Sequence, residues 1–266
     1  MLIVGELINS SRKSIRENME KRNIDFFLDI ARKQAKAGAN YIDINCSTMM
    51  DKEPEVMQWL IENIQQAVDL PLSIDTPNPL VMETGLHLAT RGQPMLNSIT
   101  GEERRCQELL PAILKYKAKV VALCLDEKGI PETGIERLRV ALALVKRLTE
   151  AGVPASDIYL DPVITPVSTS DKAGLEVLEA IRLIKNECPQ VSLICGLSNV
   201  SYGLPNRKIL NRVFMIQNLT MGMDGFILNP LDNRLMGDLH AAQALLGQDP
   251  YCGKYLSVHR TGLYQE

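Results

Sequence analysis

The sequence of 266 residues is poor in aromatic side chains, which make up 5% of it and include a single tryptophan. Its apolar runs all fall short of the roughly 18–20 residues that a membrane-spanning helix needs. Basic residues show no excess either, because 29 Lys and Arg face 32 Asp and Glu for a net charge of −3. Nucleic-acid binding relies on basic surfaces. We therefore expect no membrane association and no nucleic-acid partner.

Cysteine and histidine are present without the spacing of a metal or redox motif. No two cysteines form a Cys-x-x-Cys pair, and the three histidines, His87, His240 and His259, lie far apart. A chain of this length buries a full core and does not need disulfides. The short apolar start, residues 1–10, has no basic segment before it, so it predicts a strand rather than a signal peptide. Together these features predict a cytoplasmic protein with reduced thiols.

Short apolar segments recur along the chain and predict eight β-strands, which start about 32 residues apart on average. That spacing leaves room for a helix after each strand. The expected strands are Leu2–Ile8, Tyr41–Asn45, Leu72–Asp75, Pro94–Ile99, Val120–Leu125, Ile158–Val163, Ser192–Leu197 and Gly225–Asn229.

Helical periodicity appears in the intervening segments. Residues 25–37, for example, place apolar side chains on neighbouring turns and stop at Gly38. The other expected helices are Glu55–Val68, Leu80–Thr90, Glu103–Tyr116, Ile135–Ala151, Gly174–Lys185, Pro205–Met221 and Asn233–Leu246. Eight strand–helix units predict a single (β/α)8 TIM barrel occupying residues 1–266 as one domain. The alternative, an open doubly wound sheet, normally carries a G-x-G-x-x-G turn that is absent after the first strand.

Polar side chains stand at the carboxyl ends of the expected strands, where barrel enzymes place their chemistry. Any one of them has a structural explanation, because Asp and Asn favour turns and helix caps. A set on almost every strand would instead converge on one cavity, where a polar ligand would satisfy them. The set is Glu6, Asn9, Asp43, Asn45, Asp75, Thr76, Asn97, Ser98, Asp161, Ser198, Asn199 and Asn229.

The residue types missing from these strand ends narrow the reaction. No lysine is available for a Schiff base, no histidine for acid–base isomerisation, and the loops 201–206 and 230–232 are not glycine-rich phosphate cradles. Carboxylates without histidines are weak zinc ligands, which leaves magnesium open, and we expect no resident metal. Carboxylates and carboxamides suit a flat heterocycle with several N–H donors, because an ionised Asp accepts two parallel hydrogen bonds.

At these residues the sequence resembles the pterin-binding methyltransferases that exchange a methyl group between methyltetrahydrofolate and a corrinoid protein. The resemblance covers essentially the whole chain and rests on motifs in order rather than on any single one. The matching motifs are Gly5-Glu6 with Ile8-Asn9, Tyr41-Ile42-Asp43-Ile44-Asn45, Leu72-Ser73-Ile74-Asp75-Thr76, Met95-Leu96-Asn97-Ser98, Tyr159-Leu160-Asp161-Pro162, Gly196-Leu197-Ser198-Asn199-Val200-Ser201, Asn206-Arg207 with Asn211-Arg212, and Gly222-Met223-Asp224.

The resemblance implies a role for each site residue. It implies that Asp75, Asn97 and Asp161 anchor the pterin ring and that Asn199, as the catalytic residue, lies near N5. The remaining residues expected to bind substrate are Gly196, Ser198, Glu6, Asp43, Tyr202 and Arg207. Two departures stand out, because Leu7 occupies a position where the family carries Arg, and Tyr202 one where Gln is common.

The activity implied is methyl transfer between N5 of tetrahydrofolate and a corrinoid cobalt, with its direction left open. Tetrahydrofolate or methyltetrahydrofolate would be the substrate. Because no Asp-x-His-x-x-Gly loop is present, the corrinoid (cobalamin) would arrive on a partner protein. The resemblance also favours a homodimer. Alternatives are a dihydropteroate synthase-like pterin enzyme, for which residues 10–13 are a faint candidate phosphate loop, and a non-catalytic pterin- or corrinoid-binding module.

Overall fold

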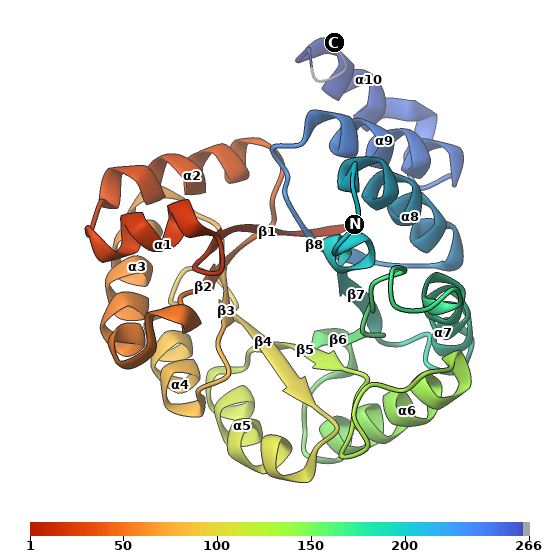
Figure 1. Cartoon of the computed structure of the whole chain (residues 1–266), viewed down its shortest axis with the longest axis horizontal. Coiled ribbons are helices and arrows are strands. Elements are labelled where there is room, and N and C mark those ends of the chain that lie inside the picture. The colour runs from red at the N-terminus through yellow and green to blue at the C-terminus, as the bar shows by residue number, and fades with distance from the viewer. Residues whose placement is uncertain (263–266) are drawn as a thin grey trace.

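A computed structural model describes residues 1–262 of the chain. These residues form a closed barrel of eight parallel strands. Figure 1 looks along the barrel and shows the helices as an outer ring. The predicted TIM barrel is therefore confirmed, and the strand bounds differ from the expected ones by no more than a few residues at each end. The strands are β1 Leu2–Asn9, β2 Tyr41–Asn45, β3 Leu72–Asp75, β4 Met95–Thr100, β5 Lys119–Leu123, β6 Ile158–Asp161, β7 Ser192–Gly196 and β8 Gly225–Leu228.

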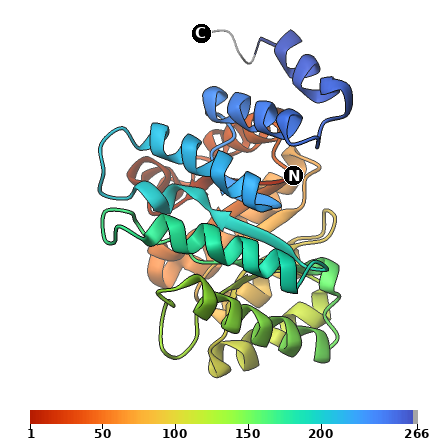
Figure 2. The ribbon, with the colours of Figure 1, turned by 90° about the vertical axis from the view of Figure 1, so that its right-hand side faces the viewer.

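All eight predicted helices are present among the described residues. They are α2 Ile24–Lys36, α3 Glu53–Ala67, α4 Pro79–Leu88, α5 Glu103–Tyr116, α6 Gly134–Glu150, α7 Ala173–Glu187, α8 Arg207–Met221 and α9 Asn233–Leu245. Sequence patterning missed two short helices, α1 Lys13–Glu20 and α10 Gly253–Arg260. The first buries only Ile15 and Met19 and the second buries no residue, so each leaves only a short apolar signal in the sequence. Figure 2 shows α10 projecting beyond the ring of helices.

Two apolar cores lie on the two faces of the sheet. The larger one fills the space between the strands and the helices, which explains why the strands read as nearly continuous apolar runs. The smaller one lies inside the barrel and consists of six buried residues with partly buried neighbours. Its buried members are Val4, Tyr41, Met95, Val121, Tyr159 and Ile194. The barrel is therefore packed through its middle rather than open.

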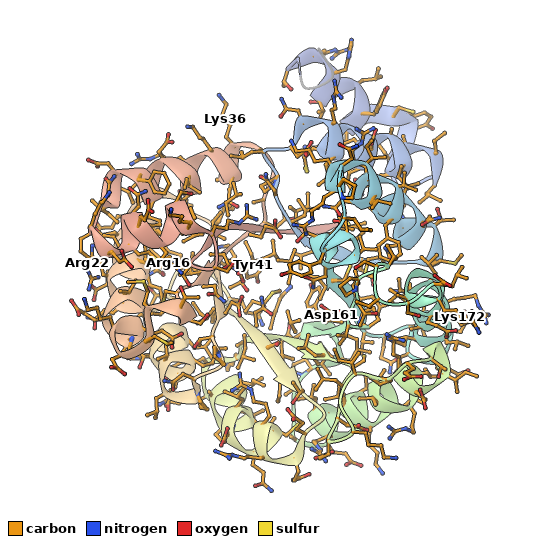
Figure 3. The ribbon with its side chains drawn as sticks, in the orientation of Figure 1. Arg16, Arg22, Lys36, Tyr41, Asp161 and Lys172 are labelled. Atoms are coloured by element: carbon orange, nitrogen blue, oxygen red, sulfur yellow. The ribbon has the colours of Figure 1, made fainter. Side chains whose placement is uncertain are left out.

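The barrel interior becomes polar toward the carboxyl ends of the strands. Side chains two residues apart on a strand point to the same face, so Asp161 follows Tyr159 on the inside of β6. Figure 3 shows Asp161 directed toward the middle of the barrel. The strand register pairs Asp75 with Asn45 on one side and with Asn97 on the other. Three polar side chains thus stand at one level on three adjacent strands.

The cysteines are free, with five of them buried and Cys252 exposed. Trp59 lies on α3, where its ring meets Phe27 edge-on at 5.7 Å between centroids, outside the barrel. No helix among residues 1–262 combines the length and apolar character that a membrane crossing requires.

Candidate functional site

Asp43 is the centre of a hydrogen-bonded group on β2, β3 and β4. Its carboxylate is 2% exposed, and its Oδ1 accepts hydrogen bonds from Ser73 Oγ at 2.7 Å and Asn97 Nδ2 at 3.1 Å. Burial and the nearby carboxylate of Asp75 raise the pKa of Asp43 well above its usual value. These bonds orient the Asn97 side chain and leave its carbonyl oxygen available to a ligand.

Asp75 ends β3 beside this group. Its Oδ2 accepts a hydrogen bond from Asn45 Nδ2 at 2.9 Å, and Asn45 is itself fixed because its Oδ1 accepts from the Ser47 hydroxyl at 2.9 Å. Burial raises the pKa of Asp75 to about 6, although the bond from Asn45 opposes that shift. The other carboxylate oxygen makes no hydrogen bond within residues 1–262, so Asp75 can accept from a bound heterocycle.

Asp161 occupies the opposite side of the barrel, at the end of β6, and is 7% exposed. The backbone N–H of Val163 donates to its Oδ1 at 2.7 Å, and the backbone N–H of Gly196 faces the same carboxylate. Burial nevertheless raises the pKa of Asp161 to about 6. Gly196 ends β7, so the polar ends of two neighbouring strands meet at this carboxylate.

Asn199 lies on the 3-10 turn η3, Leu197–Ser201, that follows β7. A Cβ atom added to Gly196 would stand 3.3 Å from Asn199 Nδ2, so the amide lies close over the Gly196 backbone. The residue is exposed, and its side chain makes no hydrogen bond within residues 1–262. The glycine therefore makes room for an amide that is free to bind a ligand.

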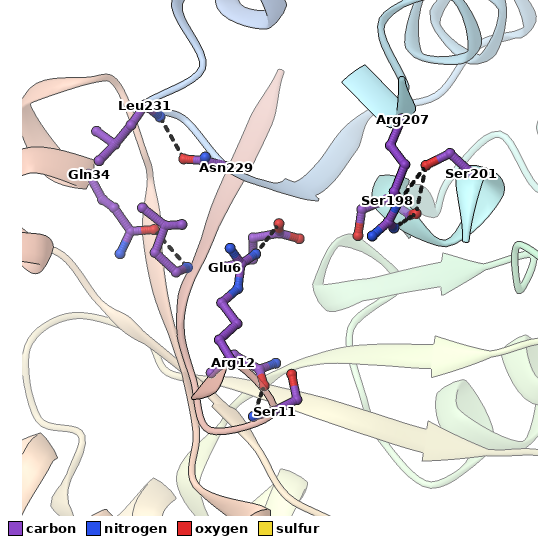
Figure 4. A network of polar contacts seen from close by, with 11 residues as sticks. Glu6, Ser11, Arg12, Gln34, Ser198, Ser201, Arg207, Asn229 and Leu231 are labelled. Atoms are coloured by element: carbon purple, nitrogen blue, oxygen red, sulfur yellow. Dashed lines mark hydrogen bonds and ion pairs between the residues drawn. The ribbon is translucent and has the colours of Figure 1, made fainter. Parts of the chain in front are cut away.

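Arg207, the first residue of α8, fixes this turn (Figure 4). Its guanidinium donates to the carbonyl oxygen of Ser198 at 2.6 Å and to the Ser201 hydroxyl at 3.0 Å. Tyr202 is 68% exposed, and its ring centroid lies 5.9 Å from the Arg207 guanidinium carbon. Arg207 and Tyr202 therefore contact each other at the rim, and Arg207 determines where the Ser198–Asn199 peptide lies.

A cavity of about 460 Å³ opens between the ends of β1 and β8 and the start of α8. Glu6 lines it and pairs with Arg12 at 2.7 Å, as Figure 4 shows. Burial raises the pKa of Glu6, while the charges of Arg12 and Arg207 oppose that rise. Ser198 and Arg207 line the same cavity from the other side.

The structure thus brings the predicted site residues to one end of the barrel in two neighbouring sets. The first, on β2 to β4, contains Asp43, Asp75 and Asn97, and the second, from β6 to α8 with β1, contains the other seven. Sequence reasoning left Ser73 out of the site. The signal that would have found Ser73 is its spacing of two residues from Asp75, which puts both side chains on the same face of β3.

Oxygen acceptors dominate this site, and amide donors accompany them. Two ionised carboxylates on opposite sides of the barrel offer acceptors for N–H groups on a planar ring. Among residues 1–262, no group of three or more His, Cys, Asp or Glu has the geometry to hold a metal ion. The arrangement is chemically suited to recognising a nitrogen heterocycle by hydrogen bonds.

Comparison with known sequences places residues 5–229 in a family described as pterin binding enzyme. The methylcorrinoid:tetrahydrofolate methyltransferase of Eubacterium limosum is 32% identical over 264 residues, which cover 98% of this chain and 97% of that protein. Methionine synthase from Mycobacterium tuberculosis is 31% identical over 244 residues, 86% of this chain, but the match covers only 20% of that longer protein.

Comparison with solved structures finds the same fold in dihydropteroate synthases. The Yersinia pestis enzyme in complex with a sulfonamide drug superimposes with a TM-score of 0.69 and 18% identity, over 92% of this chain and 94% of that one. The Xanthomonas albilineans enzyme in complex with 7,8-dihydropteroate also gives 0.69 and 18%, over 91% and 94%. At this identity the likeness is one of fold.

Proposed function

The chain belongs to the pterin-binding enzyme family, and from that premise we propose that it is a methyltransferase. In this proposal it moves a methyl group between N5 of tetrahydrofolate and the cobalt of a corrinoid protein. The observation that carries the proposal is the 32% identity to a methylcorrinoid:tetrahydrofolate methyltransferase along nearly the full length of both chains. The free amide of Asn199 over the Gly196 backbone and the buried carboxylate of Asp161 support it.

Pterin recognition in this proposal rests on three side chains. The carboxylates of Asp75 and Asp161 would accept hydrogen bonds from ring N–H groups, and the carboxamide of Asn97 would bind a ring nitrogen or oxygen. Both carboxylates lie where burial raises the pKa, so their charge is poorly solvated in the free protein. Donors on the ligand would replace the missing water.

Asn199 would act at N5. Displacing the methyl group from a tertiary amine is difficult because electron density must accumulate on the leaving nitrogen. When cobalt(I) attacks, its electron pair forms the carbon–cobalt bond, the N5–carbon bond breaks with its electron pair going to N5, and N5 takes up a proton from solvent. A hydrogen-bond donor at N5 would therefore stabilise the charge that develops there. The Asn199 amide can supply that donor more strongly in the transition state than in the ground state. In the reverse direction the amide would give up its hydrogen bond to N5, so that the N5 lone pair could attack the methyl group on cobalt.

A direct assay tests the activity. Purified protein is mixed with reduced cobalamin and methyltetrahydrofolate, and separately with methylcobalamin and tetrahydrofolate. We expect loss of the cobalt(I) absorption in the first mixture and formation of methyltetrahydrofolate in the second. If neither mixture reacts faster than without protein, a non-catalytic binding module becomes the better description.

Replacing Asn199 by alanine tests the catalytic assignment. We expect methyl transfer to fall at least ~100-fold, because one preorganised hydrogen bond to the reacting atom is lost. The exposed Asn23, whose Nδ2 donates only to Asn18 Oδ1 at 2.8 Å, gives the control variant Asn23→Ala. Circular dichroism should show both variants folded. An unchanged rate in Asn199→Ala would exclude the proposed role.

The dihydropteroate synthase-like alternative is less well supported. Its solved relatives share the fold at 18% identity, whereas the methyltransferase relative shares 32%. Arg12, one of the two basic residues of the faint phosphate loop, is paired with Glu6 at 2.7 Å. An assay with a pterin diphosphate and p-aminobenzoate distinguishes this alternative from methyl transfer.

The proposal extends to the partner and the assembly. We propose that the corrinoid arrives on a separate protein that docks at the barrel mouth over Asn199, and that the chain acts in the cytoplasm as a homodimer. Support for a cytoplasmic site comes from the free cysteines. Support for a dimer comes from an exposed apolar face on α8, formed by Ile209, Val213 and Ile216.

A further inference from the structure

We infer that Arg105 is a positioning residue that holds Asp75 and Asn97 in place for the pterin ring. Arg105 lies on α5, outside the barrel, and would not touch the substrate. The inference rests on the proposed function only in taking the ligand to be a pterin. It concerns a residue that lies outside the candidate site described above.

The guanidinium of Arg105 connects the loops that follow β3 and β4. Its Nη1 donates to the carbonyl oxygen of Pro77 at 2.6 Å. Its Nη2 donates to the carbonyl oxygens of Thr76 at 3.1 Å and Ser98 at 3.2 Å. Arg105 forms no ion pair with any carboxylate among residues 1–262, so its hydrogen bonds go to the backbone.

The backbone groups that Arg105 binds are next to the predicted ligand-binding residues. Thr76 directly follows Asp75, and Ser98 directly follows Asn97. Asp75 and Asn97 are register partners on adjacent strands. The carbonyl of each following residue lies one peptide unit beyond the residue that carries the side chain, so holding it restrains the backbone on the C-terminal side of Asp75 and of Asn97. One guanidinium therefore restrains the ends of two paired strands whose side chains must bind the same ring.

The desolvation of Arg105 shows that these contacts are not those of a surface arginine. Partial burial lowers the pKa of Arg105, and the charges of Glu108 and Glu102 oppose that shift without forming an ion pair with it in the described part of the chain. The planar fork of five N–H donors can bind several carbonyls at once, which a lysine ammonium cannot do in the same geometry. Its neighbour Arg104 is exposed and instead pairs with Glu108 at 2.8 Å.

Arg105→Ala tests the inference, with Arg104→Ala as its matched control. Tetrahydrofolate binding is measured by calorimetry. The KM for the folate substrate and kcat are measured with free cobalamin as the methyl acceptor or donor. We expect Arg105→Ala to raise the dissociation constant and KM about tenfold or more, the effect of losing one or two charge-assisted hydrogen bonds. At saturating folate, kcat should stay within about threefold of the wild type, because the weakened contacts to the pterin ring are equally strong in the ground state and the transition state. Arg104→Ala should change neither.

Arg105→Lys tests the same inference where the alanine variant does not fold. It keeps the charge and the alkyl stem but not the planar fork, so binding should weaken to an intermediate level. Millimolar guanidinium chloride should restore part of the affinity of Arg105→Ala and none to Arg104→Ala. The inference is overturned if Arg105→Ala or Arg105→Lys lowers the thermal midpoint while KM and the dissociation constant match the wild type. It is also overturned if kcat falls while KM is unchanged.

The same measurements separate this inference from the proposed function. If the wild-type protein binds tetrahydrofolate but transfers no methyl group, the proposed activity fails, while the dissociation constants of the variants still decide the role of Arg105. If the wild type binds no tetrahydrofolate, both are wrong. If the wild type binds and reacts while all Arg105 variants bind equally well, only the positioning role is wrong.

Discussion

Two carboxylates in the site, those of Asp75 and Asp161, are buried where the ionised form is poorly stabilised in the free protein. Each would carry a negative charge at neutral pH in a place where burial raises its pKa to about 6. Such carboxylates reduce the stability of the free protein and favour a ligand that donates hydrogen bonds to them. Stability and binding are therefore opposed at these two positions.

The Asp161→Asn variant measures how much the buried carboxylate of Asp161 reduces the free energy of unfolding. Because the pKa of Asp161 lies at about 6 against a usual 3.8, the folded state binds more protons than the unfolded state in that interval. The contribution of Asp161 to the free energy of unfolding therefore falls as pH rises from about 4 to 6 and levels off above. Asparagine does not titrate, so the stability of the variant relative to the wild type should rise by about 2.5 kcal/mol from pH 4 to pH 8. Urea unfolding at both pH values gives the comparison, and a difference that does not change with pH would contradict it.

Helix α4 packs against β3 without space for any side chain at Gly85. A Cβ atom there would lie 2.6 Å from Cγ2 of Ile74, which is fully buried on the strand that ends in Asp75. This close approach sets the distance between α4 and the sheet. It also links the position of a helix on the outside of the barrel to a site residue on the inside.

Gly85→Ala should destabilise the protein by about 1–3 kcal/mol, because Ile74 has no free space into which to move. The matched control is Gly174→Ala on α7, where the nearest atoms lie at an ordinary 3.6 Å. Alanine is the better helix former, so that variant should be neutral or slightly more stable. Thermal unfolding of both decides the matter, and equal midpoints would show that the contact at Gly85 relaxes without cost.

The elements that could be predicted from the sequence are those with a strong local pattern. The strands β2 and β3 match their predicted ranges residue for residue, because they are short apolar runs ended by polar residues. The helix α10 was missed because it buries nothing and leaves no periodic apolar signal.

At the site, the sequence indicated which residues gather at the carboxyl ends of the strands but not how they are held there. The bond from Asn97 to Asp43 joins residues 54 positions apart, and no local pattern predicts such a contact. Arg105 was missed because its partners are backbone carbonyls, which leave no mark on the residue types around them. The side-chain roles themselves stay predictions until the variants are measured.

At the scale of the whole molecule, the outer ring of helices leaves one apolar face uncovered. Ile209, Val213 and Ile216 are 58%, 52% and 38% exposed and lie on one side of α8. Their spacing of four and three residues makes them neighbours on the helix surface. A second copy of the chain would bury them in the proposed homodimer.

Val213→Asp should therefore convert the dimer to a monomer, since an unpaired charge would be buried at the centre of the interface. Sedimentation velocity at several concentrations provides the measurement. Leu142→Asp on α6, at a residue that is 42% exposed, serves as the control and should leave the assembly unchanged. A wild-type protein that is monomeric at all concentrations would contradict the proposed assembly.

The barrel interior below the polar side chains is filled by the side chains of Tyr41, Met95 and Tyr159. It is therefore a well that is closed at the bottom and open at one end. Anything that enters must leave by the same route. Under the proposed function the folate lies at the floor of this well and the corrinoid protein covers it. The folate is then first to enter and last to leave, and a partner that stays too long on the mouth would slow every turnover by trapping the product beneath it.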